Sequence, residues 1–115
     1  MIQHRSMDGD YKLLRTRLVA DTLFVEWPNA HLGVCNFDDD LLIDFQRLEQ
    51  HVRGPVILDF AQIENIDDSF FTSIMYLSRV LQARSIDLTV RLSPSILELA
   101  RMCHFDRFFR ATSGE

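Results

Sequence analysis

Apolar residues recur along this chain with two different spacings. Near the amino terminus, and again at 86–92, they alternate with polar residues, as in strands that bury one face. This alternation predicts strands at 12–19 and 23–27, joined by a turn at 20–22, and another strand at 86–92. An uninterrupted apolar run, Val56–Phe60, predicts a strand inside the sheet. Because the 86–92 strand is polar on one side, we expect one sheet face to be partly open to water.

Between the strands the apolar spacing changes to that of a helix. A loop at 28–37 precedes the first predicted helix, which runs from the acidic residues 38–40 to about Val52, where Gly54-Pro55 should end it. The second helix covers 69–84, and the third begins at Ser93-Pro94. The apolar stripes predicted for the three helices are Leu41, Phe45, Leu48 and Val52; Phe70, Ile74, Leu77 and Leu81; and Ile96, Leu99, Ala100 and Cys103.

The elements follow the order β-β-α-β-α-β-α, with a short last strand expected near Phe109. Strands that alternate with helices pair in parallel through right-handed crossovers, whereas the opening two strands should be antiparallel. We therefore expect an α/β fold with a mixed four- or five-stranded sheet. Residues 11–112 should form a single domain after a flexible arm at 1–10. The predicted core contains Leu58, Phe60, Ile66, Ile74, Leu77, Leu88, Val90 and Leu99.

Composition argues against several classes of function. The 115 residues carry a net charge of −5, so their charge favours neither nucleic acid nor anionic lipid as a partner. No apolar run could span a bilayer, and residues 1–10 lack the apolar core of a signal peptide. Cys35 and Cys103 form no close pair and should be reduced thiols of a cytoplasmic protein, with Cys103 in the core. The histidines lack metal-ligand spacing, so we expect neither metal nor cofactor.

The start of the second helix is the most informative part of the chain. Asp67, Asp68 and Ser69 follow the Val56–Phe60 strand after a short loop. Helix N-termini favour anionic groups, because several backbone N–H groups there lack partners within the helix. Ser69 is therefore a candidate N-cap and a candidate phosphorylation site, and the two roles can coexist. Phe70 has two open interpretations, as a core residue or as part of an exposed apolar patch for binding.

Catalysis is not expected at this serine. Ser69 has no histidine near it in the sequence, and no Gly-x-Ser-x-Gly motif surrounds it. No glycine-rich loop that could cradle a phosphate precedes a helix either. We therefore expect a protein without enzyme activity.

Three motifs in order carry a family resemblance. Val56–Phe60 followed by Ile66–Ser69 looks like an apolar strand, a short loop and an Asp-Ser-Ser-Gly-Leu signature. Leu88–Pro94 looks like a strand that leads into a Ser-Pro helix start, and Phe105–Phe109 is similar to a Leu-Asp-x-Leu-Phe ending. Together they resemble the STAS domain, the fold of anti-sigma factor antagonists and of sulphate-transporter cytoplasmic domains. The resemblance implies a STAS-like sheet with helices mainly on one face.

The resemblance also assigns roles to individual positions. Asp67 matches the aspartate of the family signature, and Ser69 matches the serine that is phosphorylated in anti-sigma factor antagonists. Asp68 stands in place of the first serine and Phe70 in place of the following glycine. His104 stands where a glycine is common before the closing segment. A phenylalanine beside the serine should obstruct the close approach of a kinase backbone that glycine would allow.

Two functions follow as expectations. One is a regulatory module that binds an anti-sigma factor or serine kinase and is switched by phosphorylation at Ser69. The alternative is a non-phosphorylated STAS subunit of a transporter or signalling complex, with a transporter ATPase as its partner. In both, the predicted binding surface is the start of the second helix, at Asp67, Asp68, Ser69 and Phe70.

Overall fold

The computed structural model describes residues 11, 13–28, 40–64, 66 and 68–113. The predicted arm at 1–10 and nearly all of the predicted loop at 28–37 lie outside the described residues, so both remain predictions. In chain order the elements are β1 (Arg15–Val19), β2 (Thr22–Glu26), α1 (Asp40–Leu48), β3 (Val56–Phe60), α2 (Asp68–Ala83), β4 (Leu88–Leu92), α3 (Pro94–Met102), the 3₁₀ turn η2 (Phe105–Arg107) and β5 (Arg110–Ser113).

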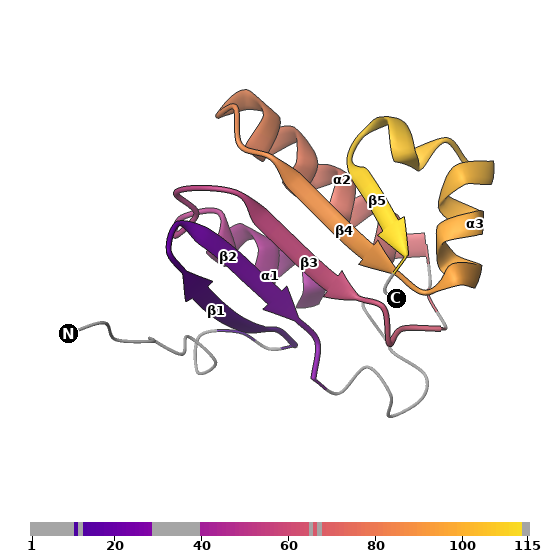
Figure 1. Cartoon of the computed structure of the whole chain (residues 1–115), viewed down its shortest axis with the longest axis horizontal. Coiled ribbons are helices and arrows are strands. Elements are labelled where there is room, and N and C mark those ends of the chain that lie inside the picture. Colours follow the sequence, from indigo (N-terminus) through magenta and orange to yellow (C-terminus); the bar gives the residue numbers. More distant parts are fainter. Residues whose placement is uncertain (1–10, 12, 29–39, 65, 67, 114–115) are drawn as a thin grey trace.

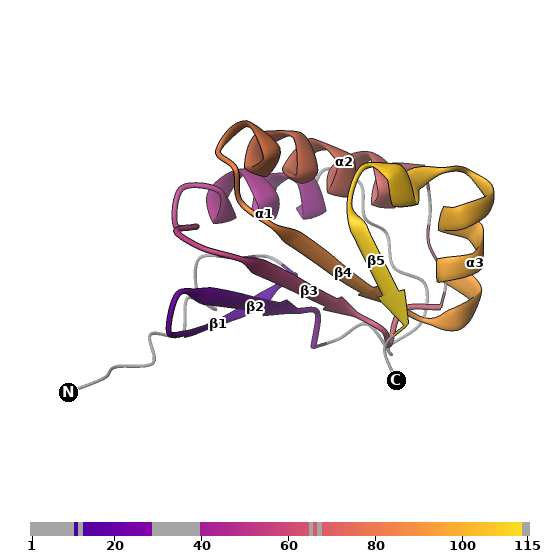
Figure 2. The ribbon, with the colours of Figure 1, turned by 45° about the horizontal axis from the view of Figure 1, so that its top comes forward.

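The strands form one five-stranded mixed sheet in the order β1-β2-β3-β4-β5. β1 and β2 are antiparallel, and the remaining neighbours pair in parallel. This confirms the predicted α/β fold and its mixed sheet. Helices α1 and α2 lie side by side over one face of the sheet, and α3 lies at its β5 end (Figures 1 and 2). The opposite face of the sheet is not covered by a described helix.

The core lies between the sheet and α1 and α2. Inward residues alternate with half-exposed ones along β3 and β4, as the period of a strand requires. Six of the eight predicted core residues are buried and a seventh, Ile66, packs against the core half-buried. Leu99 was predicted wrongly, since its side chain is 38% exposed. Ile96 and Ala100 of the predicted α3 stripe are buried, and Leu97 faces inward in place of Leu99.

Helix α1 ends at Leu48, four residues earlier than predicted. The Arg84 guanidinium donates hydrogen bonds to the Glu49 and Val52 carbonyl oxygens, both at 2.7 Å. Carbonyls beyond the helix end are thereby paired without a glycine cap. Gly54 has a different role from the one predicted, because a Cβ atom at Gly54 would overlap the Asp21 carbonyl oxygen in the turn after β1.

The first strand is also shorter than predicted, because the chain before it is held by α1. The buried carboxylate of Asp44 accepts hydrogen bonds from the Leu13 and Leu14 backbone N–H groups, at 2.7 and 3.2 Å. These donors therefore do not belong to a strand, and β1 begins only at Arg15. No pattern in the sequence indicates this contact, which joins residues 30 and 31 positions apart.

Candidate functional site

The loop that leads into α2 is held at the edge of the sheet where the parallel strands end. In α/β folds, ligands and partners commonly meet this edge. The loop begins with a turn in which Ile63 N–H donates to the Phe60 carbonyl oxygen at 3.1 Å. The Ser93 hydroxyl, 5% exposed, then donates to the Ile63 carbonyl oxygen at 3.0 Å. The lead-in to α2 is therefore tied to the start of α3.

Ser93 lies at the predicted N-cap position of α3, but its hydroxyl does not make the capping hydrogen bond expected there. It is the N-cap residue of α3 and is followed by Pro94 at the first helical position, as the sequence predicts. Its hydroxyl makes no capping bond within α3, because it reaches across to the loop before α2 instead. Ser93 thus links two neighbouring helix starts.

Phenylalanine rings anchor the first turn of α2. Neighbouring ring centroids are 6.5 Å apart for Phe45–Phe60, 5.8 Å for Phe60–Phe70, 5.3 Å for Phe70–Phe71 and 4.5 Å for Phe71–Phe105. These separations are those of favourable aromatic contacts. The run of rings, here called the aromatic run, crosses from α1 through β3 and α2 to η2.

Burial of Phe70 corrects one interpretation of the sequence. Its side chain is 0% exposed, so it does not contribute to an exposed apolar patch. The helical stripe of Phe70, Ile74, Leu77 and Leu81 is confirmed, because all four are fully buried. Sequence alone left Phe70 ambiguous because helix starts are commonly exposed. Here the first turn already lies over Phe60, which leaves no room for water.

Ser69 is half-buried in the first turn of α2. The sequence suggested that Ser69 is the N-cap of this helix. The helix begins at Asp68, so Ser69 is instead its second residue. Asp67 and the side chain of Asp68 lie outside the described residues. Of the four predicted binding residues, the structure therefore describes two side chains: Ser69 is half-buried and Phe70 is fully buried. A phosphate there would meet the positive end of the 16-residue helix.

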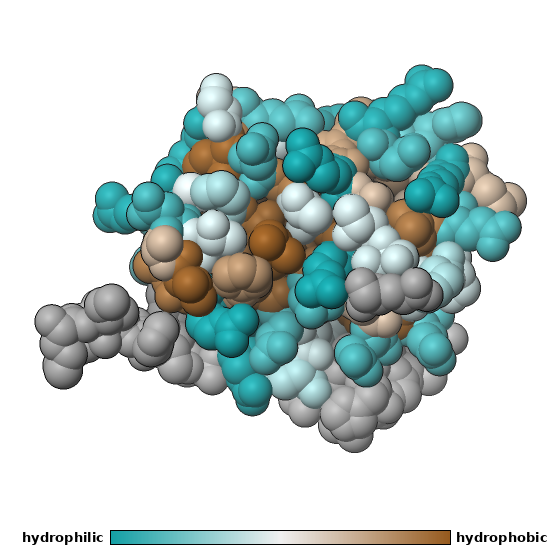
Figure 3. All heavy atoms as spheres, viewed as in Figure 1, coloured by the Kyte–Doolittle hydropathy of each residue, from teal (hydrophilic) through white to brown (hydrophobic). Residues whose placement is uncertain are grey.

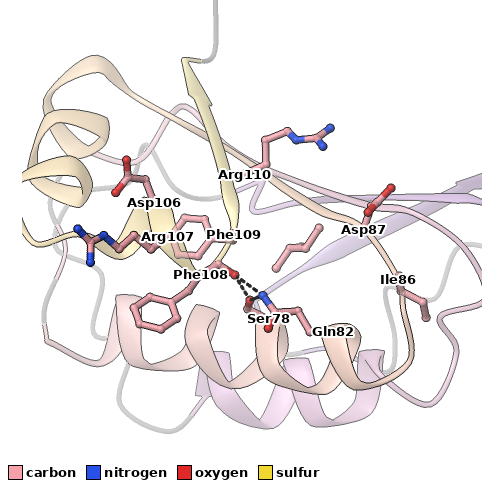
Figure 4. Close-up of a pocket in the computed structure, with 10 residues that line it drawn as sticks. Ser78, Gln82, Ile86, Asp87, Asp106, Arg107, Phe108, Phe109 and Arg110 are labelled. Atoms are coloured by element: carbon pink, nitrogen blue, oxygen red, sulfur yellow. Dashed lines mark hydrogen bonds between the residues drawn. The ribbon is translucent and has the colours of Figure 1, made fainter.

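A separate hollow of about 420 Å³ lies between α2, β4 and the η2–β5 junction (Figure 4). Ser78 and Gln82 point from α2 toward the Phe108 carbonyl oxygen, and both donate hydrogen bonds to it, the Gln82 amide at 3.0 Å. These donors fix the chain between η2 and β5. The sequence pattern did not single out either residue, because a polar residue within a helix is ordinarily solvated.

The Phe108 side chain, by contrast, is 39% exposed. Cys103 was predicted in the core and is exposed instead. Cys103 directly follows α3 and Phe108 directly follows η2, two elements that contact β5.

Within the described part of the chain, no group of three or more histidine, cysteine or acidic side chains could hold a metal ion. None of the described helices has the length and apolar character needed to cross a membrane. Neither a protein-family model nor a curated protein matches the sequence.

Proposed function

We propose that this chain is a STAS-like regulatory module that binds a protein partner at the start of α2 and is switched by phosphorylation of Ser69. The partner class implied by the resemblance is an anti-sigma factor or a serine kinase in the cytoplasm. The module itself has no enzyme activity in this proposal. The observation that carries it is the placement of Ser69, half-exposed in the first turn of a helix at the carboxyl edge of the parallel strands.

Burial of Phe70 supports the phosphorylation step. From the sequence alone, the phenylalanine after Ser69 argued against phosphorylation of this serine, because it should obstruct a kinase. Its ring packs inward against Phe60 and Phe71, so it does not stand between Ser69 and an approaching protein. The backbone N–H groups of the helix start would stabilise the added negative charge.

The binding step is supported by the contacts that surround the same turn. The aromatic run packs against the buried side of the turn. The Ser93 hydroxyl donates a hydrogen bond to the loop that precedes the turn. A partner that binds a preformed surface does not need to order it, which favours affinity. Phosphate on Ser69 would add about −1.5 to −2 charges to that surface, enough to release a partner with apolar or acidic contacts there.

The experiment uses the binding partner recovered from the native cell and then purified. The Ser69→Asp variant should bind it about tenfold or more weakly than the unchanged protein in a calorimetric titration. The matched control is Ser95→Asp, because Ser95 is an exposed serine at the same second position of α3, next to the same sheet edge. The control should bind as the unchanged protein does.

Two other outcomes decide between alternatives. Unchanged affinity for Ser69→Asp would place the interface elsewhere and overturn the proposal. Weakened binding by Ser69→Asp, with no phosphate on Ser69 in protein from native cells, would favour the constitutive subunit of a transporter or signalling complex. Phosphosite mapping by mass spectrometry supplies that second measurement.

A further inference from the structure

The sheet face turned away from α1 and α2 is here called the open face. Side chains that share it follow from the pairing register, in which paired residues of neighbouring strands point to the same side. Its charged strand residues are Arg15, Arg17, Glu26, Asp59, Arg91 and Arg110. None of the described helices covers this face (Figures 1 and 2).

The open face is cationic although the chain as a whole is acidic. Each of its two carboxylates already lies beside an arginine, Glu26 at 3.5 Å from Arg15 and Asp59 at 3.6 Å from Arg91. Among the described strand residues of this face, four arginines therefore stand against two carboxylates, while the whole chain has a net charge of −5. A local charge opposite to that of the whole molecule favours an acidic partner at that place.

The centre of the open face is apolar. Phe24 and Ile57 are paired residues of β2 and β3 and are both half-buried. The Arg17 guanidinium lies over the Phe24 ring, 5.3 Å from its centroid, which holds this cation in place. In the space-filling view, hydrophobic side chains gather on this face among hydrophilic ones (Figure 3). A hollow of about 380 Å³ adjoins Phe24 and reaches Asp59 and Arg91.

We propose that the open face docks an acidic amphipathic segment of a protein partner. An apolar side chain of that segment packs on Ile57 and on the part of the Phe24 ring that Arg17 leaves uncovered, and its carboxylates face the surrounding arginines. Two copies of this chain fit less well face to face, because each copy would bring an excess of arginines over carboxylates against the same excess. Nucleic acid fits less well, because Phe24 and Ile57 at the centre of the face offer a phosphate backbone no hydrogen-bond donor. The surface includes no residue of the α2 start, so it goes beyond the proposed function.

The test uses two synthetic amphipathic helical peptides with the same length and the same leucine positions. One carries glutamate and the other lysine at the polar positions. We expect the glutamate peptide to shift the backbone amide resonances of Phe24, Ile57 and Thr89 in a two-dimensional NMR titration. The lysine peptide should leave them unchanged, and added salt should weaken the binding of the glutamate peptide.

Charge reversal supplies the matched comparison. The double substitution Arg17→Glu and Arg110→Glu should weaken binding of the glutamate peptide by about tenfold or more. Arg79→Glu with Arg101→Glu changes the net charge equally at exposed arginines of α2 and α3, and should change the affinity by less than about threefold. Preserved amide spectra of both variants confirm that they fold.

Several results would overturn the proposal. These are no resonance shift at millimolar glutamate peptide, equal binding of the lysine peptide, shifts confined to α2 or α3, or an equal loss of affinity in both double variants. Sedimentation that shows a dimer of the unchanged chain, dissociated by the Arg17 and Arg110 substitutions, would make a second copy the occupant and also reject it.

Discussion

His104 shows how a single residue departs from what its backbone position favours. It lies between α3 and η2 with φ 62° and ψ 22°, in the left-handed region. Glycine adopts this conformation without steric cost, whereas a residue with a Cβ atom pays roughly 1–2 kcal/mol. The family resemblance places a glycine at this position, and the backbone geometry gives a physical reason for one.

We therefore expect His104→Gly to keep or raise the free energy of unfolding, by up to about 1 kcal/mol in urea denaturation. The matched control is His51→Gly, because His51 is exposed in a turn and is not among the described residues with positive φ. The control should lower stability slightly, since glycine gains freedom in the unfolded chain. A larger loss for His104→Gly than for His51→Gly would contradict this account.

At the scale of the elements, a polar contact joins α1 to α2. The Tyr76 hydroxyl of α2 donates a hydrogen bond to a carboxylate oxygen of Glu49, just after α1. This hydrogen bond, together with burial and the charge of Glu49, raises the pKa of Tyr76 above its ordinary value of 10.0. The stabilisation is therefore complete below pH 10.0 and is lost as the pH rises through the raised pKa of the folded protein.

Removing the carboxylate should return the tyrosine toward ordinary behaviour. In Glu49→Gln we expect the Tyr76 phenol to ionise at lower pH than in the unchanged protein, measured by tyrosinate absorbance. Tyr76→Phe serves as the control that identifies the signal, because one of the chain's two tyrosines is then absent. Superimposable titration curves for Glu49→Gln and the unchanged protein would show that the contact does not form in solution.

A leucine of α2 and a leucine of α3 allow a comparison of how much each side chain contributes to the free energy of unfolding. Leu77 in α2 is fully buried, whereas Leu99 in α3 is 38% exposed. We expect Leu77→Ala to lower the free energy of unfolding by about 2–5 kcal/mol, because it leaves a cavity in the core. Leu99→Ala should cost less than about 1 kcal/mol in the same denaturation experiment. Equal losses would mean that α3 packs differently from the arrangement described.

The same two helices show what the sequence could and could not predict. In α2 the buried stripe is the one that the apolar spacing predicts. In α3 apolar residues occupy 96, 97, 99, 100 and 103, so more than one face could turn inward. The choice depends on neighbours brought together only by the fold, namely β4, β5 and η2. The burial of Phe70 depended in the same way on a distant ring, Phe60.

At the scale of the whole molecule, the sheet joins both halves of the chain. Trp27, the chain's single tryptophan, is buried just after β2, whereas α3 and β5 lie toward the other end of the sheet. A single domain should unfold in one cooperative step. Urea transitions followed by tryptophan fluorescence and by far-ultraviolet circular dichroism should therefore share one midpoint. Two separate midpoints would divide the chain into independent units.

The aromatic run has a consequence for how a signal at Ser69 could be transmitted. Rings from β3 and η2 contact Phe70 and Phe71 in the first turn of α2, so a rearrangement of this turn would have to break these contacts. A phosphoryl group on Ser69 would then change the charge of the surface without changing the conformation of the backbone. A partner would then distinguish the two forms by electrostatics alone. That discrimination should fade as ionic strength rises, whereas a switch based on conformational change would keep it.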